Sequence, residues 1–445
     1  MRKRNVDILN GNISKQLLLF FFPVFAGYII QQTYSFADSI ILGKLVSKQA
    51  LAAVGGSPNA IITIITNLIS GISSAIMVRI ALNYGKGAFD KVNDVIKSAI
   101  FLCVILAGSL TIVLFFSAKY LLILMQAPLD TYDLSLIYLK IYSLCLIPLF
   151  IYNVGLSMMR GLGDSRKPIY LIILTAIVKI GFDLLFVGTF SLGVIGVAIA
   201  TIISHSISAL AIMLILHFST DVIHHSIKDF GYDKEELQNI IKIGIPFSIQ
   251  SMAFAIPNTL IQAKINSFGT DAVAAYYTFS NADSLFWCFN NALGIASTTM
   301  ISQNYGNKNY KRVKSIFLYS ILYEALGCIL FGVFFHFFAH EVIGMFSSDP
   351  TVIEMGKIMI LITSRLYLLY VMAEAVNSFC KAVGKAKAPM FIAMVTILLT
   401  RILYLLFIPQ KTFIYPIFSF PITWAFTSIS YSVYYLNSCR IKENN

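Results

Sequence analysis

The stretch AIFLCVILAGSLTIVLFF, Ala99 to Phe116, decides the fold class because it holds no charged residue over a length that can cross a bilayer. A membrane-spanning helix needs about 20 mostly apolar residues, whereas a strand of a membrane barrel shows about ten residues of alternating polarity. Apolar residues follow one another here without alternation, as they also do in LLILMQAPL, Leu121 to Leu129. The stretch therefore predicts a transmembrane helix.

Similar stretches recur along the whole chain. Of its 445 residues, 58% are hydrophobic and only 12% are charged, and the mean hydropathy is +0.78. Soluble domains have about 25% charged residues, so the composition excludes that class. Apolar windows predict about twelve spanning helices, at residues 15–43, 57–84, 95–117, 136–160, 168–189, 193–217, 238–267, 280–305, 313–339, 352–380, 388–408 and 415–438.

The net charge of +12 comes from basic residues that gather in alternate loops. One set of loops holds most lysines and arginines, for example Arg2 to Arg4, Arg166 and Lys167, and Lys308 to Lys314, whereas Lys44, Lys48 and Lys119 are among the few in the opposite set. Basic loops remain on the cytoplasmic side, so both termini are predicted to be cytoplasmic. The charge pattern indicates contact with membrane lipids and excludes a nucleic-acid partner. The basic start followed by a long apolar run predicts a retained first helix, not a cleaved signal peptide.

Two halves of the chain resemble each other in a series of segments that recur in the same order. QALAAVGGS pairs with DAVAAYYTFS, and GLGDSRKPIY, Gly161 to Tyr170, pairs with AVGKAKAPMF, Ala382 to Phe391. Such repeats, with six helices each, are related by an axis along the membrane normal. The predicted fold is an all-α polytopic membrane protein with twelve transmembrane helices in two pseudo-symmetric six-helix bundles. The predicted domains are an N-terminal lobe at 1–220, a cytoplasmic linker at 221–237 and a C-terminal lobe at 238–445.

Two facing bundles favour alternating access around a midplane site over a channel, because no filter-like loop or charged ring is present. Pro23 and Pro246 open the first helix of each half, where a missing backbone hydrogen bond permits a bend. Either proline could be a static kink or a moving hinge.

Ionisable residues within apolar windows are costly and mark candidate functional sites. Asp38, in QQTYSFADSIILG, has no charged neighbour along its own helix, whereas Lys179 and Asp183, in IVKIGFDLLFV, are four residues apart and share one helix face. A carboxylate in a water-accessible pocket of low dielectric can load and release a proton, so Asp38 is the candidate proton carrier. The alternative is a permanent pair with Lys179. Arg79 and Asp283 are expected to reach water from helix ends, and Glu324 has no assigned role.

Motifs of known enzyme classes are absent: the chain has no HExxH sequence, no phosphate-binding Walker loop and no DDxxD cluster. The six cysteines lack metal-ligand spacing, so neither a zinc site nor a disulfide framework is predicted. His205 is interpreted as a packed polar residue. No cofactor is expected.

The order of these segments resembles that of the multidrug and toxic compound extrusion (MATE) transporters, in a bacterial branch. It is carried by LLFFFPVF, QQTYSFADSIILGKLVSKQALAAVG, MRGLGDSRKPIYLIILTAIVKIGFDLLFV, IGIPFSIQSMAF and ISQNYG, and it covers essentially the whole chain. The resemblance implies a monomeric two-lobed antiporter of the bacterial cytoplasmic membrane that exports cationic or amphipathic drugs or toxic organic compounds in exchange for protons or sodium.

The resemblance also implies a cation site in the N-terminal lobe. Asp38, Asp183 and Thr201 fall at family positions for this site, but Lys179 stands where the family has asparagine. A fixed cation repels another cation, so a proton gradient is expected to drive transport and sodium is less favoured.

In the C-terminal lobe, some family members place acids on the seventh and tenth helices. Here the seventh helix has none, and Glu374 lies on the tenth. Glu374 and Arg401 could form an ion pair, or Glu374 could contact substrate. Aromatic and amide side chains suited to flat cations are predicted to line the cleft: Tyr34, Phe36, Gln250, Asn258, Gln262, Asn281 and Trp287.

Two alternative functions remain open. A lipid-linked oligosaccharide flippase of the same superfamily would need a more basic cavity, and Lys179, Arg365 and Arg401 keep this alternative open. An integral-membrane enzyme or receptor is the lesser alternative, because the internal repeat and the missing catalytic motifs argue against it.

Overall fold

The structure, a computed structural model, describes residues 7–125, 127–218, 231–409 and 411–439. Within these ranges the chain is helical and contains no strand. Lipid offers no hydrogen-bonding partner to the backbone, and a helix pairs its N–H and C=O groups within one segment. The all-α class predicted from the apolar stretches is therefore confirmed.

Contacts within the chain divide it into two compact units. The N-unit comprises Ala26–Ile245, and the C-unit comprises Met1–Phe25 together with Pro246–Asn445. These units differ from the predicted lobes in two places: Met1–Phe25 belongs to the C-unit, and the segment 238–245 belongs to the N-unit. Most of the predicted linker, at 219–230, lies outside the described residues, and the lobe limits themselves stay a prediction.

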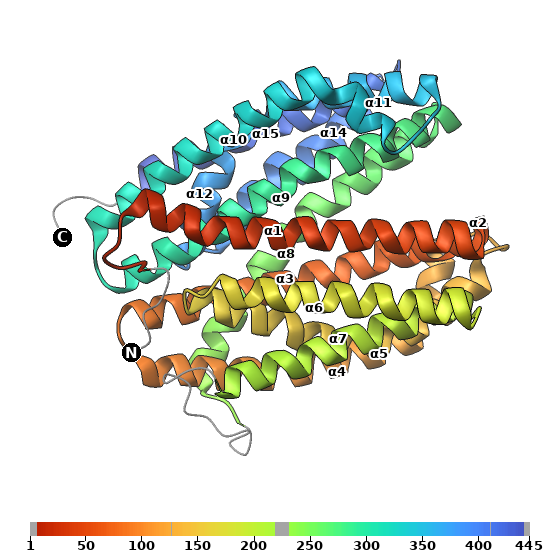
Figure 1. Cartoon of the computed structure of the whole chain (residues 1–445). Helices are drawn as coiled ribbons and strands as arrows, with labels where there is room; N and C mark the ends of the chain where they lie inside the picture. The colour runs from red at the N-terminus through yellow and green to blue at the C-terminus, as the bar shows by residue number, and fades with distance from the viewer. Residues whose placement is uncertain (1–6, 126, 219–230, 410, 440–445) are drawn as a thin grey trace. The chain divides into compact units, whose positions relative to one another are not determined.

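The N-unit is built around α5 (Tyr132–Gly161), which packs against α3 (Ser57–Gly85), α4 (Phe89–Leu124) and α7 (Gly193–Phe218) (Figure 1). The unit also contains the later part of α1 (Ile13–Ile41), α2 (Lys48–Gly55), α6 (Arg166–Asp183) and the first part of α8 (Lys234–Asn266). Leu139, Leu146 and Phe150 of α5 are fully buried in its apolar core. This central helix thus holds the surrounding ones in place.

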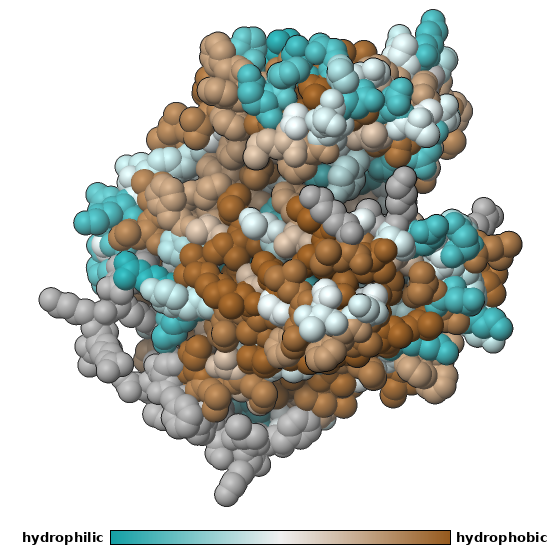
Figure 2. Space-filling model, turned by 45° about the vertical axis from the view of Figure 1, so that its right-hand side comes forward, coloured by the Kyte–Doolittle hydropathy of each residue, from teal (hydrophilic) through white to brown (hydrophobic). Residues whose placement is uncertain are grey.

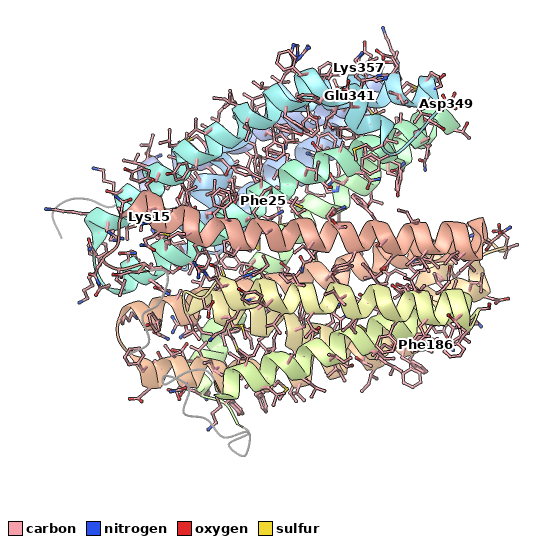
Figure 3. All side chains as sticks on the ribbon, viewed as in Figure 1. Lys15, Phe25, Phe186, Glu341, Asp349 and Lys357 are labelled. Carbon is pink, nitrogen blue, oxygen red and sulfur yellow. The ribbon has the colours of Figure 1, made fainter. Side chains whose placement is uncertain are left out.

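In the C-unit the corresponding position belongs to α9 (Thr270–Gly306), which packs against α10 (Tyr310–Gly344), α11 (Pro350–Ser364) and α12 (Val371–Ala382). The unit continues with α13 (Lys387–Ala393), α14 (Thr400–Phe407) and α15 (Ile414–Tyr434). Charged residues gather where α10 leads into α11, as the labels of Glu341, Asp349 and Lys357 show in Figure 3. Asp349 caps α11 by accepting hydrogen bonds from the backbone N–H groups of Thr351 and Val352.

Nine helical segments among the described residues are long and apolar enough to cross a membrane, and α11 with α12 makes a tenth span that bends by 46°. The bend lies between Ser364 and Tyr367, directly before a short 3-10 helix, Tyr367–Tyr370. The long helices α9 and α15 complete the predicted twelve. α9 is less apolar because it buries polar side chains such as Asn290, Gln303 and Asn304.

Large apolar side chains remain exposed on the outer helices. On α4 the exposed fraction is 72% for Phe116 and 77% for Leu124, and Figure 2 shows hydrophobic side chains over much of the visible surface. A soluble protein rarely exposes such extended apolar areas. Lipid contact explains this surface.

Two helices pass from one unit to the other. The boundary falls between Phe25 and Ala26 in α1 and between Ile245 and Pro246 in α8, and Pro23 lies shortly before the first boundary. Figure 3 labels Phe25 near the point where α1 changes unit. Each predicted hinge proline is therefore located at, or next to, the place where its helix leaves one unit and enters the other.

Candidate functional site

Three charged side chains of the N-unit meet between α1 and α6. Lys179 Nζ donates hydrogen bonds to Asp183 Oδ2 at 2.5 Å and to Asp38 Oδ1 at 3.0 Å. Lys179 and Asp183 come together because residues four apart lie on one helix face. Asp38 comes from α1, 141 positions away from Lys179. The structure thus brings three of the predicted coupling residues into one cluster, and Asp38 is paired with Lys179 in it.

Exposure differs within this cluster. Lys179 is 2% exposed and Asp183 is fully buried, whereas the Asp38 side chain keeps 24% of its surface. Asp183 Oδ1 has no hydrogen-bond partner among the described residues. Asp38 is therefore the most exposed of the three side chains, and the buried Asp183 keeps one oxygen that can accept a further hydrogen bond.

The helix changes character directly after the inner acid. α6 ends at Asp183, and the chain continues as a π-helix, Leu184–Thr189, whose Phe186 is labelled in Figure 3. A π-helix has about one more residue per turn than an α-helix, so the side chains that follow it point in different directions. Such segments occur frequently at functional sites. This local change was not predicted from the sequence.

Thr201 and His205, on α7, complete this region. The Thr201 hydroxyl donates to the carbonyl of Val197 on its own helix, and Nδ1 of His205 is 2.9 Å from the Thr201 carbonyl. The His205 ring also packs edge-on against Tyr152 at 5.6 Å. Thr201 therefore belongs to the helix that packs on α6, but its hydroxyl donates to the backbone and not to a carboxylate.

The predicted cleft residues are distributed over both units. Tyr34 and Phe36 are half-buried on the N-unit part of α1, whereas the remaining candidates lie in the C-unit. There, buried Gln250 donates to both Asn377 and Tyr431. Gln262 donates to Asn266, and Trp287 Nε1 donates to Asp283.

Asn281 differs from these amides. Its Nδ2 is buried and has no hydrogen-bond partner among the described residues. An amide N–H group in this state can donate to a ligand without first breaking a bond inside the protein.

Glu374 and Arg401 do not form the predicted ion pair. Glu374 accepts a hydrogen bond from Ser378 at 2.9 Å, while Arg401 donates to Asn258 and Thr423 at 2.7 and 2.8 Å. Two long side chains on adjacent helices do not necessarily point toward each other. Here Glu374 and Arg401 each hydrogen-bond to neutral side chains instead.

Two residues expected to reach water are held inside their units. Arg79 forms a two-pronged ion pair with Glu236, with distances of 2.7 to 2.9 Å. Asp283 is 7% exposed and accepts hydrogen bonds from Trp287 and Tyr367. Both expectations were wrong. Folding brings Arg79 to a partner 157 positions away and Asp283 to Tyr367, 84 positions away, and the local sequence shows neither contact. Glu324 accepts a hydrogen bond from Asn290 at 2.6 Å.

Comparisons with known proteins agree with this architecture. The MatE family model matches the chain twice, at residues 23–185 and 246–406, so each match begins at one of the two prolines. "Probable multidrug resistance protein YpnP" of Bacillus subtilis (strain 168) is 28% identical over 355 residues, which are 79% of this chain and 78% of that protein. "Probable multidrug resistance protein YoeA" of the same strain is 24% identical over 394 residues, 87% of this chain and 85% of that protein.

A solved structure shares the fold. It is titled "Outward-facing conformation of a multidrug resistance MATE family transporter of the MOP superfamily" and superimposes with a TM-score of 0.89 at 20% identity, covering 96% of both chains. The two halves of the chain are thus both matched by one family model, and the fold is shared over nearly the full length.

Proposed function

Because this chain belongs to the MatE family of multidrug efflux transporters, we propose that it is a secondary active antiporter that exports cationic or amphipathic compounds in exchange for protons. Its proposed location is the bacterial cytoplasmic membrane, with both termini in the cytoplasm, as the distribution of lysine and arginine indicates. We propose that it works as a monomer. Small organic molecules and membrane lipids are its partners.

The cluster of Asp38, Lys179 and Asp183 is the observation that carries the proposal. With both acids ionised and the lysine charged, the cluster has one net negative charge, so a single proton neutralises it. Since neighbouring groups at 2.5 and 3.0 Å interact strongly, this proton belongs to the cluster as a whole. The partial exposure of Asp38 supports its role as the group through which the proton enters and leaves.

The lysine also supports protons over sodium as the coupling ion. Two unit charges about 4 Å apart repel by about 4 kcal/mol at the effective dielectric constant near 20 that suits protein sites. A sodium ion beside the two carboxylates would meet this repulsion from Lys179, whereas a proton can bind to a carboxylate oxygen directly. Asp183 Oδ1, which has no hydrogen-bond partner among the described residues, is one such oxygen.

Alternating access requires a movement that exposes the site to each side in turn. Pro23 and Pro246 are the proposed hinges, because a proline removes one helical hydrogen bond, and Pro246 lies at, and Pro23 shortly before, the point where its helix changes unit. The proposed substrate contacts are the aromatic and amide side chains predicted to line the cleft, such as Tyr34 and Trp287, together with Glu374.

Transport in proteoliposomes tests this proposal. The purified chain is reconstituted, and ethidium movement is followed while a pH gradient and a sodium gradient are imposed separately. We expect the pH gradient to drive ethidium transport and the sodium gradient at constant pH to have no effect. Strong stimulation by sodium alone would reject proton coupling, and absence of ethidium transport under both gradients would reject cation export.

A further inference from the structure

Two cysteines of the C-unit place their sulfur atoms next to each other. Cys380 lies in the last turn of α12, and Cys439 is the last residue of a π-helix, Tyr435–Cys439, that follows α15. The two Sγ atoms are 3.9 Å apart, although the residues are 59 positions apart in the sequence. Both are free thiols. The fold of the C-unit therefore creates a thiol pair that no spacing along one helix predicts.

A lysine from the loop after α12 lies against this pair. Lys385 Nζ donates to Cys439 Sγ at 3.7 Å and to the carbonyl of Ser438 at 2.7 Å. The loop returns toward the pair because the backbone N–H of Lys385 donates to the carbonyl of Cys380, and Gly384, with a φ of +75°, allows the tight turn. Cys439 thus has a positive charge beside its sulfur.

The two thiols differ in their access to solvent. Cys380 is fully buried, whereas Cys439 is 7% exposed. The side chain of Lys385, which contacts Cys439 Sγ, is itself exposed. Cys439 also lies outside the predicted spanning window 415–438. Of the two thiols, Cys439 is therefore the one that has access to solvent, and it adjoins an exposed charged side chain.

The contacts of Cys439 favour its thiolate, which is the reactive form of a cysteine. A hydrogen bond from the Cys380 thiol lowers the pKa of the Cys439 thiol, and Tyr434 and Lys385 act in the same direction, against the effect of burial. Cysteines that react with peroxides combine thiolate character with access to solvent, and they often lie next to a second cysteine that resolves the first oxidation product. Cys439 and Cys380 have this arrangement.

We propose that the pair is an oxidation site for hydroperoxides, with Cys439 as the nucleophile and Cys380 as the resolving thiol. The Cys439 thiolate attacks one oxygen of hydrogen peroxide and the O–O bond breaks, which gives a sulfenic acid and a hydroxide that takes up a proton to form water. The Cys380 thiol then attacks the Cys439 sulfur, the S–O bond breaks, and the leaving hydroxide takes the proton of Cys380. Two thiols and one peroxide thus become one disulfide and two water molecules, and the two electrons lost by sulfur reduce the peroxide.

The product disulfide would join the last turn of α12 to the chain that follows α15. Its sulfurs are about 2.05 Å apart, so the two side chains must rotate toward each other from their present contact. The C-terminus is proposed to lie in the cytoplasm, where disulfides are usually transient and redox-sensing. We therefore expect the bond to form under peroxide and to be removed by thiol reductants. This chemistry does not depend on transport.

Peptide mapping of the purified full chain tests the site. The protein in non-ionic detergent is treated with hydrogen peroxide, and the remaining thiols are blocked with N-ethylmaleimide. Disulfide-linked peptides are then identified by mass spectrometry, with and without dithiothreitol. We expect a linked pair of peptides that contain Cys380 and Cys439 only after peroxide treatment, and we expect dithiothreitol to separate them.

Two variants separate the roles of the two thiols. In Cys380→Ser we expect oxidation of Cys439 to stop at the sulfenic acid, which dimedone traps. In Cys439→Ser we expect Cys380 to remain a free thiol that is alkylated once the protein is denatured. Cys103→Ser is the matched control, because Cys103 is a buried cysteine of the N-unit, and we expect it to form the link as the unmodified chain does.

Lys385→Gln tests the contribution of the neighbouring charge. We expect peroxide to oxidise Cys439 about threefold to tenfold more slowly in this variant, a modest factor because water partly screens an exposed ammonium group. Lys387→Gln is the control, because Lys387 is an exposed lysine at the start of α13, and we expect no change in rate. An unchanged rate in Lys385→Gln would overturn the assignment of Cys439 as the activated nucleophile.

The unmodified chain alone is sufficient to reject the proposal, even if no variant folds. Absence of the link between Cys380 and Cys439 after peroxide treatment would overturn it. A link that forms only between two molecules would do the same, and so would a sulfenic acid at Cys439 that Cys380 does not resolve.

Discussion

Lys179 determines the charge balance of the N-unit cluster because its ammonium group lies within hydrogen-bonding distance of two carboxylates. An adjacent positive charge favours the ionised form of an acid, and burial disfavours it. The nearly complete burial of Lys179 and Asp183 means that water screens neither effect. We therefore propose that this one residue decides whether the cluster favours a proton or a second cation.

Lys179→Asn is expected to move the pH optimum of transport upward. Without the lysine, the two acids repel each other and hold a shared proton up to higher pH, so release requires a more alkaline side. The optimum is read from ethidium transport in proteoliposomes at several pH values, with sodium absent and then present. An unchanged optimum would show that Lys179 has no part in coupling, and new stimulation by sodium would show that the repelling cation had excluded that ion.

Asp38→Asn is expected to abolish transport driven by a pH gradient while the protein still inserts and folds. The amide keeps an oxygen that can accept the hydrogen bond from Lys179 Nζ but cannot exchange a proton. Ethidium export is compared at matched protein levels, with Ser35→Ala, on the same helix, as the control. Full export by Asp38→Asn would remove this carboxylate from the mechanism.

The sequence predicted the part of this cluster that depends on spacing along one helix. Lys179 and Asp183 were predicted to be neighbours because four residues complete about one helical turn. The contact of Asp38 with Lys179 could be considered only as an alternative, since it depends on how α1 packs against α6. Arg79 and Glu236 are also far apart in the sequence, and no local pattern pairs them.

At the scale of the helices, an ion pair between Arg79 and Glu236 connects the first turn of α8 to α3. Glu236 is 1% exposed and receives two-pronged hydrogen bonds from Arg79, with a longer one from Asn83 at 3.4 Å. The segment that leads into α1 is held in a comparable way in the C-unit, where Arg312 and Asn304 donate to the carbonyl of Ile8. Thus each helix that changes unit is fixed at its start.

Arg79→Gln is expected to destabilise the protein by about 3 kcal/mol, the lower end of the range for breaking a buried ion pair. The charged Glu236 would remain buried without its partner. In the double variant Arg79→Met with Glu236→Met, we expect most of this loss to be recovered because both charges are removed. Thermal unfolding in detergent measures both. Equal instability of the single and double variants would mean that the pair contributes through packing instead of charge.

Pro246 distinguishes a hinge from a static kink. Pro246→Ala restores a helical hydrogen bond, so the α8 helix is expected to become more stable. If the unit boundary at this residue has to bend during each cycle, ethidium transport will fall although thermal stability rises. Ser251→Ala, on the same helix, is the control. Unchanged transport with raised stability would identify a static kink.

Over the whole molecule, the repeat predicted the two-bundle architecture. It did not predict which unit contains the first part of α1 and the first part of α8. The order of repeated segments and the apolar stretches were sufficient for twelve helices in two halves. Contacts assign Met1–Phe25 to the C-unit, although it was predicted in the N-terminal lobe. They assign the segment 238–245 to the N-unit, although it was predicted in the C-terminal lobe. Contacts across long sequence distances decide such an exchange, and hydropathy carries no information about them. The bend between α11 and α12 was also missed, although Arg365 interrupts the apolar window at the break.

Membrane orientation is the remaining property that charge asymmetry predicts for the whole chain. Lysines and arginines gather in the loops on the side of both termini, and by the positive-inside rule we expect these loops to lie in the cytoplasm. Ser226 lies in the predicted cytoplasmic linker, outside the described residues, whereas Lys48 lies in a predicted loop of the opposite set. In a variant without native cysteines, we expect a membrane-impermeant thiol reagent to label Lys48→Cys on intact cells. Ser226→Cys should react only after the membrane is opened. Reversed labelling would place both termini outside, and it would also reverse the direction in which a proton gradient could drive export through Asp38.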